Sequence, residues 1–268
     1  MVTFPNCKIN LGLHITVKRP DGFHELETVF YPVPLKDILE VVSSTTLQFQ
    51  STGIDIPGNP ASNLCLKAYH LLKEDFPQLP PVQMHLHKII PMGAGLGGGS
   101  ADGAFALQLL NDKYFLGLSP TQLMKYALQL GSDCPFFILN QPCYATGRGE
   151  DLTPIKLDLS GYRFVIVHPG IHINTKWAFE QIQPGLPARS IKEIIQLPIQ
   201  DWKYYLSNDF ESPIKQNYPA IEAIKLALYK DGAIYASMSG SGSTVFGIYP
   251  TNANIELNKQ LNYRIDII

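Results

Sequence analysis

The sequence predicts an α+β fold in two domains, built of mixed sheets and helices. Strand patterns occur in both halves of the chain, and helical patterns stand among them without a regular strand–helix alternation. A polar stretch over residues 147–162, with Gly, Asp and Pro, separates the two halves. We therefore expect one domain over residues 1–150 and a second over residues 151–268.

The first half begins with the clearest strand pattern. Over residues 7–17 the odd positions are apolar, which predicts a half-buried strand with Lys8 and Asn10 side by side on its non-core face. A capping-box pattern at Ser119 and Gln122 indicates the start of a helix that follows another helix. The other elements expected here are strands at 25–33, 37–42 and 82–90 and helices at 63–75, 100–111 and 120–130.

The second half carries one strand pattern, then helices, then two more strands. Pro219 and Gly232 bracket a helical segment in the positions where Pro starts and Gly ends helices. The last two strand patterns enclose a short segment rich in Gly and Ser. The elements expected here are strands at 163–167, 233–238 and 244–249 and helices near 190–196 and 220–230.

The most informative segment is the glycine loop, residues 91–101. Five of its eleven residues are glycine, and it passes directly into an apolar helical pattern. Glycines let a backbone approach a ligand closely and adopt positive φ, and a helix that starts after them points free N–H groups at that ligand. This combination predicts a phosphate-binding loop.

Two common kinds of phosphate loop do not fit this segment. A Walker A loop needs Lys and then Ser or Thr after its last glycine, whereas Gly99 is followed by Ser100 and Ala101. Three of the glycines match the G-x-G-x-x-G spacing of dinucleotide folds, but that motif needs a second strand after its helix. A second helix pattern stands there instead, which argues against a dinucleotide-binding domain.

Three segments together resemble the motifs of a known family. The loop reads Pro-x-Gly-x-Gly-Leu-Gly-Gly-Gly-Ser-Ala, residues 5–14 read Pro-Asn-Cys-Lys-Ile-Asn-Leu-Gly-Leu-His, and residues 237–244 read Ser-Met-Ser-Gly-Ser-Gly-Ser-Thr. In this order they resemble the three motifs of the GHMP kinases, which include galactokinase, homoserine kinase and mevalonate kinase. The resemblance runs from residue 5 to about residue 249. It implies a two-domain kinase fold with ATP and substrate in the cleft between the domains.

The resemblance also implies an ATP site in the glycine loop. Mg²⁺ would bridge the β- and γ-phosphates of ATP, and Ser100 at the end of the loop is a candidate ligand of that ion. The implied ATP-binding residues are Pro91, Met92, Gly93, Ala94, Gly95, Leu96, Gly97, Gly98, Gly99, Ser100 and Ala101.

Lys8 and Asp133 are the candidate catalytic residues. Phosphoryl transfer needs positioning and charge neutralisation, and a hydroxyl acceptor also needs its proton taken. On local grounds Lys8 reads as a solvated strand lysine and Asp133 as a turn or cap residue, and only the resemblance assigns both to catalysis. The sequence leaves open whether Asp133 abstracts the proton or holds Lys8 and the hydroxyl.

Residues 19–26, 130–137 and 168–175 resemble one branch of the family, which phosphorylates a cytidine-diphosphate-linked alcohol in isoprenoid precursor synthesis. At residue 23 that branch usually has Tyr and this chain has Phe, so a ring remains for stacking but a hydroxyl is lost. Trp177 or Phe179 could give a second stacking face, although both also read as core aromatics. The resemblance places cytosine recognition at His24. The implied substrate-binding residues are Asn10, Phe23, His24, His168, Thr175, Ser241 and Gly242.

Composition excludes several other classes of protein. The net charge of −2 gives no basic surface for nucleic acid. No apolar run approaches the roughly 20 residues that span a bilayer, and the N-terminus lacks a signal-peptide pattern. The four cysteines form no C-x-x-C pair, which indicates reduced thiols in a cytoplasmic protein. His85 and His87 share a strand face but have no third ligand in view, so they are not predicted to bind metal.

The sequence as a whole predicts an ATP-dependent, Mg²⁺-requiring small-molecule kinase, of undetermined oligomeric state. Two alternatives stay open. One is a GHMP kinase for another alcohol, such as homoserine or mevalonate, which the segments at 19–26 and 130–137 argue against. The other is a catalytically silent nucleotide-binding protein on the same fold, which the presence of both Lys8 and Asp133 argues against.

Overall fold

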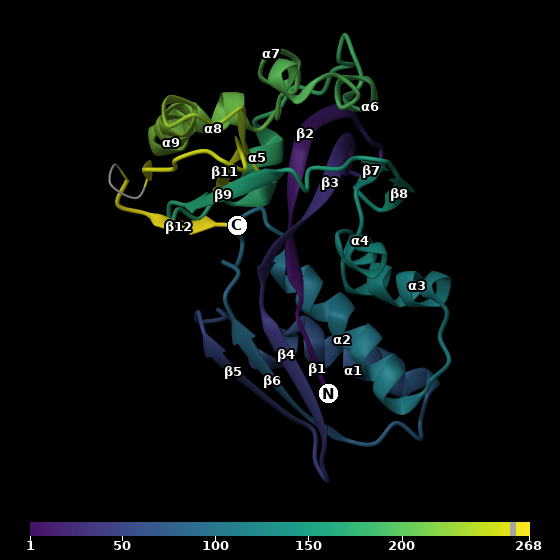
Figure 1. Cartoon of the computed structure of the whole chain (residues 1–268). Coiled ribbons are helices and arrows are strands. Elements are labelled where there is room, and N and C mark those ends of the chain that lie inside the picture. Colours follow the sequence, from purple (N-terminus) through teal and green to yellow (C-terminus); the bar gives the residue numbers. More distant parts are fainter. Residues whose placement is uncertain (258–260) are drawn as a thin grey trace. The chain divides into compact units, whose positions relative to one another are not determined.

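The protein is described by a computed structural model over residues 1–257 and 261–268 (Figure 1). The chain forms two compact units, and each unit is discontinuous in sequence. Unit 2 takes residues from both sides of residue 150, and the functional division at that point stays a prediction. Unit 1 comprises Met1–Lys8, Pro34–Met92 and Gly97–Gln141, and unit 2 comprises Ile9–Val33, Gly93–Leu96 and Pro142–Ile268.

Unit 1 is a four-stranded sheet packed with helices. The strand order is β1-β4-β6-β5, with β4 antiparallel and β5 parallel to β6. Its strands are β1 (Val2–Thr3), β4 (Ile38–Ser43), β5 (Gln48–Gly53) and β6 (Val82–Lys88). Its helices are η1 (Pro60–Ser62), α1 (Leu64–Asp75), α2 (Gly98–Tyr114), α3 (Pro120–Leu130) and α4 (Cys134–Leu139).

Local sequence signals explain where these elements begin. Val82, Met84 and Leu86 are buried on β6 in strict alternation with half-buried residues, as the periodicity predicts. The capping box at Ser119 and Gln122 is present, and it starts α3 directly after α2. The predicted succession of two helices after the glycine loop is therefore confirmed.

Unit 2 holds an antiparallel sheet of order β10-β11-β9-β12, with α9 packed against β10 and β11. A second sheet has the order β2-β3-β7-β8, and its first two strands begin or end in unit 1. The strands are β2 (Asn6–Lys18), β3 (His24–Lys36), β7 (Cys143–Thr146), β8 (Asp151–Pro154), β9 (Tyr162–His168), β10 (Tyr235–Met238), β11 (Val245–Pro250) and β12 (Arg264–Ile267). The helices are α5 (Thr175–Glu180), α6 (Ile191–Ile194), η2 (Ile199–Asp201), α7 (Trp202–Tyr205), α8 (Glu211–Asn217) and α9 (Pro219–Lys230).

The expectation that β2 is half-buried is wrong. Its residues 6–15 are buried on both faces, including Lys8, Asn10 and His14. The even positions are covered by polar partners rather than by water, for example by the Asp209 carboxylate, which lies 3.1 Å from His14 Nδ1. Alternation of polar and apolar residues therefore separates two kinds of buried face in this strand, and not core from solvent.

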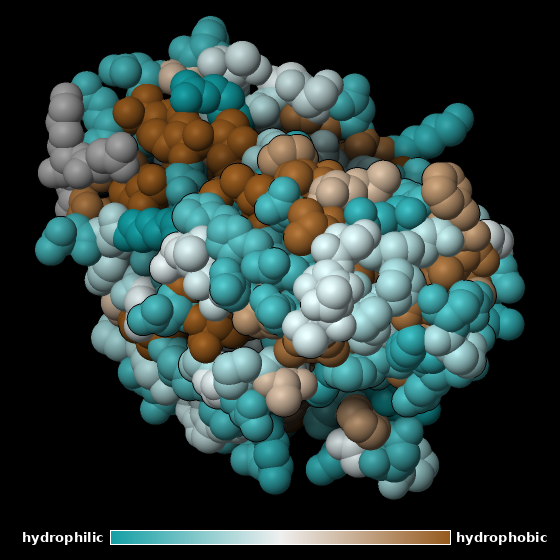
Figure 2. Space-filling model, turned by 90° about the horizontal axis from the view of Figure 1, so that it is seen from below, coloured by the Kyte–Doolittle hydropathy of each residue, from teal (hydrophilic) through white to brown (hydrophobic). Residues whose placement is uncertain are grey.

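No helix in the described part of the chain is long and apolar enough to cross a membrane. Figure 2 shows one face of the molecule, on which hydrophobic areas, drawn in brown, lie among hydrophilic residues, drawn in teal. Cys7, Cys65, Cys134 and Cys143 are all buried, and no disulfide joins any of them within the described part of the chain.

Candidate active site

Helix α2 begins at Gly98, within the glycine loop. Its N-cap is Gly97, which has the left-handed φ of +69° and no side chain to bond the first-turn N–H groups. A helix of 17 residues therefore presents uncapped backbone donors and the positive end of its dipole at this point. These donors fit a phosphate group.

The two glycines at the start of α2 pack closely against neighbouring side chains, which leave no room for a Cβ. A Cβ on Gly97 would lie 2.9 Å from Phe137 Cζ and 3.2 Å from Lys8 Cγ. A Cβ on Gly98 would lie 2.8 Å from Ile90 Cγ2 and 3.0 Å from the Nζ of Lys88. In unit 1, glycine is thus needed so that the helix start can pack closely on two lysine side chains.

A buried charge cluster lies beneath the start of α2. Lys88, the last residue on the buried face of β6, donates to Asp37 Oδ2 and, over 2.7 Å, to Asp102 Oδ2. The other oxygen of Asp37 accepts the backbone N–H groups of Ile89 at 2.5 Å and Ile90 at 2.8 Å. The cluster therefore joins β6, the approach to the glycine loop and α2. Sequence reasoning missed it, although a Lys in phase with the buried positions of a strand is a readable signal.

The cluster carries two carboxylates and only one cation. Burial raises the pKa of Asp102 to about 8, with Lys88 opposing this shift and Asp37 adding to it. For Lys88, burial lowers the pKa, but the two carboxylates outweigh it and the pKa is raised. Asp102 Oδ1 is buried and has no hydrogen-bond partner among the described residues. These observations indicate that Asp102 is protonated at neutral pH, beside a charged Lys88.

Lys8 and Asp133, the two candidate catalytic residues, lie close together in unit 1. Lys8 Nζ lies 3.6 Å from Asp133 Oδ2, and the two side chains are 4% and 35% exposed. Burial lowers the pKa of Lys8, and the charge of Asp133 opposes that shift. The pair thus joins a desolvated cation to a carboxylate that water and ligands can still reach.

Asp133 stands at the N-cap position of a helix but does not make the hydrogen bonds of a capping side chain. It is the N-cap of α4, yet its side chain makes no capping hydrogen bond. The alternative reading of Asp133 as a helix cap is therefore not supported. Cys134, the next residue, contacts the hydroxyl of Ser100 in the first turn of α2, and burial raises the pKa of its thiol to about 12. The starts of α2 and α4 lie side by side.

In unit 2, the first half of the glycine loop packs on a second loop, residues 239–244, which we call the Gly-Ser loop. Ser239 Oγ donates to Gly95 O over 2.8 Å, and Thr244 N donates to Ala94 O over 3.2 Å. Gly95 has a φ of +80°, and a Cβ there would lie 1.9 Å from Ser239 O. Only glycine allows this approach of two backbones.

Asn10 also contacts the Gly-Ser loop. Its backbone N–H donates to Ser239 Oγ over 3.3 Å, and its side-chain amide donates to Thr28 Oγ1 over 3.0 Å. The side chain predicted to touch the substrate is therefore buried and engaged with the protein. Ser241 and Thr175, two other predicted substrate-binding residues, lie together, with their hydroxyl oxygens 3.2 Å apart.

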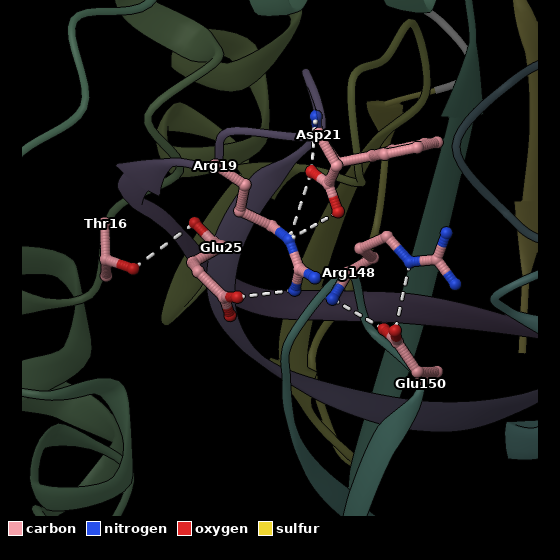
Figure 3. Close-up of polar contacts among 7 residues, drawn as sticks. Thr16, Arg19, Asp21, Glu25, Arg148 and Glu150 are labelled. Atoms are coloured by element: carbon pink, nitrogen blue, oxygen red, sulfur yellow. Dashed lines mark hydrogen bonds and ion pairs between the residues drawn. The ribbon is translucent and has the colours of Figure 1, made fainter.

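A polar network fixes the turn that carries Phe23 and His24 (Figure 3). Arg19 Nε donates to both oxygens of Asp21, and its Nη1 donates to Glu25 Oε1 over 2.6 Å. Asp21 in turn accepts the backbone N–H of Phe23 over 3.1 Å, and this hydrogen bond, with the charge of Arg19, lowers the pKa of Asp21. The backbone leading into β3 is therefore held in one conformation.

Arg148 covers one side of this turn. Its guanidinium carbon lies 4.9 Å from the centre of the Phe23 ring, and its Nε donates to Glu150 Oε1 over 3.0 Å. Phe23 is nevertheless 52% exposed. One face of the Phe23 ring is thus covered by a cation–π contact.

His24 stacks on Phe179, with ring centres 5.0 Å apart and planes inclined by 18°. Trp177 packs against Tyr218 instead. Burial and the charge of Lys18 lower the pKa of His24, so its imidazole is neutral at neutral pH and carries one donor and one acceptor. That combination suits recognition of one edge of a base.

In the described part of the chain, His168 makes no side-chain hydrogen bond or ring contact with the other predicted substrate residues. It ends β9, where its register partner is Arg264 of β12. Burial and the Arg264 charge lower its pKa, and its Nδ1 is buried without a hydrogen-bond partner among the described residues. A role in substrate binding stays a prediction for His168.

Among the described residues, no group of three or more His, Cys, Asp or Glu side chains could hold a metal ion. His85 Nε2 and His87 Nδ1 both bond to Thr52 Oγ1, at 3.0 and 2.9 Å. The two histidines are therefore hydrogen-bonded to the same threonine hydroxyl.

Two family models match the chain. GHMP kinases N terminal domain matches residues 63–141, and GHMP kinases C terminal matches residues 186–259. The first match includes the glycine loop and Asp133, and the second includes the Gly-Ser loop. The chain belongs to the GHMP kinases and is a small-molecule kinase.

The similarity to one kind of GHMP kinase extends over the whole chain. A relative from Bacteroides fragilis (strain YCH46), named 4-diphosphocytidyl-2-C-methyl-D-erythritol kinase, is 53% identical over 259 residues, which cover 95% of this chain and 94% of the relative. A crystal structure of 4-(cytidine 5'-diphospho)-2C-methyl-D-erythritol kinase is 31% identical, with a TM-score of 0.86 and coverage of 100% and 98%. The Methanococcus jannaschii mevalonate kinase, 15% identical with a TM-score of 0.73 and coverage of 100% and 97%, shares the fold.

Proposed function

We propose that this chain transfers the γ-phosphoryl group of ATP to the 2-hydroxyl of 4-diphosphocytidyl-2-C-methyl-D-erythritol, a step of non-mevalonate isoprenoid precursor synthesis. The observation that carries the proposal is the Lys8–Asp133 pair at the start of α2. Relatives of that name at up to 53% identity support the choice of acceptor.

The residues of unit 1 divide the chemistry among them. The first-turn N–H groups of α2 bind ATP phosphates, and Lys8 stabilises the negative charge that develops on the acceptor oxygen. Asp133 accepts the hydroxyl proton or holds Lys8 and the hydroxyl in line. Mg²⁺ would be held by oxygen donors, with Ser100 as the candidate protein ligand, and would neutralise charge on the β- and γ-phosphates.

The residues of unit 2 recognise the cytidine substrate. His24 reads an edge of the base, Phe23 and Phe179 supply aromatic surface, and Thr175, Ser241 and Gly242 bind nearer the acceptor. Asn10 and His168 complete the proposed set. That the enzyme is cytoplasmic is part of the same proposal, and the cysteines, which form no disulfide among the described residues, support it.

The test is a substrate panel with ATP and Mg²⁺, read by phosphorus NMR of the product. The cytidyl compound should be phosphorylated, while homoserine and mevalonate should not. Turnover of homoserine or mevalonate alone would assign the chain to another GHMP activity. Absence of ATP turnover with every acceptor would favour the catalytically silent alternative.

A further inference from the structure

Asn208 is a buried polar residue in the segment 207–211, which the sequence analysis did not single out. Its side-chain N–H groups donate to Met238 O and Gly240 O, both over 2.8 Å. Its Oδ1 accepts the backbone N–H of Phe210 over 3.0 Å, and the residue is 3% exposed. Both hydrogens of this amide are thus bonded to carbonyls, one at the end of β10 and one in the Gly-Ser loop. These two bonds fix the distance between the two carbonyl oxygens.

The segment that carries Asn208 is itself anchored on β2. Leu13 N donates to Ser207 O and Asp209 N donates to Leu13 O, each over 2.9 Å. The Asp209 carboxylate accepts Ile15 N over 2.8 Å. Asn208 therefore projects from a backbone that is held on both sides, and not from a free turn.

A second side chain from this segment fixes the entry to the Gly-Ser loop. Glu211 Oε1 accepts Ser237 Oγ over 2.7 Å and Met238 N over 2.8 Å, and its other oxygen pairs with Lys225. Met238 is thus bonded through its N–H to Glu211 and through its carbonyl to Asn208. The strand end and the loop that follows are held together from one segment.

The Gly-Ser loop has freedom that these bonds remove. Gly240 and Gly242 adopt φ of +57° and +92°, so the loop can populate several backbone conformations in the absence of restraints. Ser239 donates a hydrogen bond to Gly95 O, and Thr244 donates one to Ala94 O. The backbones of Gly95 and Ser239 are so close that neither can shift toward the other. A change in the Gly-Ser loop must move this part of the glycine loop, which continues covalently into the start of α2.

We propose that Asn208 is a positioning residue for phosphoryl transfer, which selects the conformation of the Gly-Ser loop and, through it, of Ala94 and Gly95. Its effect on rate rests on the proposed kinase function. Its effect on loop structure does not, because that can be measured without any substrate.

The test is Asn208→Asp, which keeps the shape of the side chain but faces two carbonyls with a carboxylate. We expect kcat to fall about ten- to a hundredfold, the scale of a small misplacement of bound reactants. The KM for the cytidine substrate should change less than kcat, because the contacts of His24 and Phe23 lie on another segment, and only Ser241 and Gly242 of the proposed substrate residues lie in the Gly-Ser loop. Amide hydrogen exchange of Ser239 and Thr244 should accelerate about tenfold, as for loss of one hydrogen bond.

Two controls separate positioning from stability. Asn217→Ala removes an exposed amide on α8 and should leave kcat and exchange unchanged. Tyr249→Phe removes a buried hydroxyl bonded to Leu228 O over 3.1 Å and should lower Tm without lowering kcat. Equal losses of kcat in Tyr249→Phe and Asn208→Asp at the same loss of Tm would overturn the proposal.

The exchange measurement separates this proposal from the kinase proposal. If no acceptor is phosphorylated, accelerated exchange at Ser239 and Thr244 in Asn208→Asp still supports the positioning role, and native exchange overturns it. Should Asn208→Asp fail to fold, Ser239→Ala tests the next contact, the hydrogen bond to Gly95 O. A native kcat with native exchange at Thr244 in that variant would overturn the proposal.

Discussion

The two glycine-rich loops of this chain are held in place by different forces. The start of α2, in unit 1, rests on a buried lysine with two carboxylates. The Gly-Ser loop, in unit 2, is held by the neutral amide of Asn208 and by serine hydroxyls. The stability that a buried charge cluster contributes depends on pH, and removing one of its charged members is strongly destabilising. Hydrogen bonds of a neutral amide do not depend on pH in this way. Similar composition therefore does not imply a similar kind of rigidity.

The largest effect should come from the chemistry assigned to unit 1. Asp133→Asn keeps the size of the side chain but removes the proton acceptor and the charge beside Lys8. We expect kcat to fall by roughly 10²–10⁴, the usual range for loss of an acid–base group. Steady-state kinetics with ATP and the cytidine substrate measure it, with exposed Asp112→Asn on α2 as the control. A variant with native kcat would contradict the proposed role.

The next effect tests the packing of α2 on the charge cluster. Gly98→Val places carbon 2.8 Å from Ile90 Cγ2 and next to Lys88 Nζ, so the helix start must shift. Overpacking costs about 1–3 kcal/mol, and ATP affinity should weaken about ten- to a hundredfold if that cost falls on the bound state. Calorimetric titration with a non-hydrolysable ATP analogue measures it. Gly161→Val, at an open position, should bind normally; equal affinities would show that the helix start does not hold the nucleotide.

His24 should report on unit 2 alone. His24→Ala should weaken binding of the cytidine substrate about tenfold to a hundredfold, since an unpaired buried hydrogen bond costs about 1–3 kcal/mol. ATP affinity should stay the same. Wild type should discriminate against a uridine analogue, and the variant should discriminate less. Equal use of both nucleosides by wild type would remove the recognition role from His24.

The smallest expected effect is on the pH dependence of Tm, which the charge cluster beneath the start of α2 should show and the amide bonds of the Gly-Ser loop should not. The pKa of Asp102, raised to about 8 in the folded protein, lies above its usual value of 3.8 in the unfolded chain. Between these values the folded state holds the additional proton, so this group's stabilisation is present at low pH and is lost as pH rises toward 8. Asp102→Asn should flatten the fall of Tm between pH 5.5 and pH 8.5, and Asp112→Asn should not. Parallel Tm profiles for wild type and Asp102→Asn would contradict a protonated Asp102.

Sequence patterns predicted the longer elements well because each carries its own periodicity or cap. The strand at 82–90 and the helix at 120–130 are confirmed with small changes in their ends. The short elements β5, β7, β8, β12, α4, α5, α7 and α8 were not predicted, because pieces of four to seven residues depend on tertiary pairing more than on local propensity. The site shows the same division. Lys8 and Asp133 were found through motif resemblance, whereas Asn208 and Lys88 act through contacts far apart in sequence.

The charge cluster also restricts the order in which its residues can be exchanged. Replacing Lys88 by a neutral residue leaves two acids in a dry interior, and replacing Asp37 also removes the acceptor for Ile89 N and Ile90 N. Replacing Asp102 by its neutral isostere leaves Lys88 paired with Asp37, the carboxylate that also accepts Ile89 N and Ile90 N. Mutational paths through these three positions should therefore begin at residue 102, and a library that varies all three should recover Lys88 replacements only together with a change at an acid.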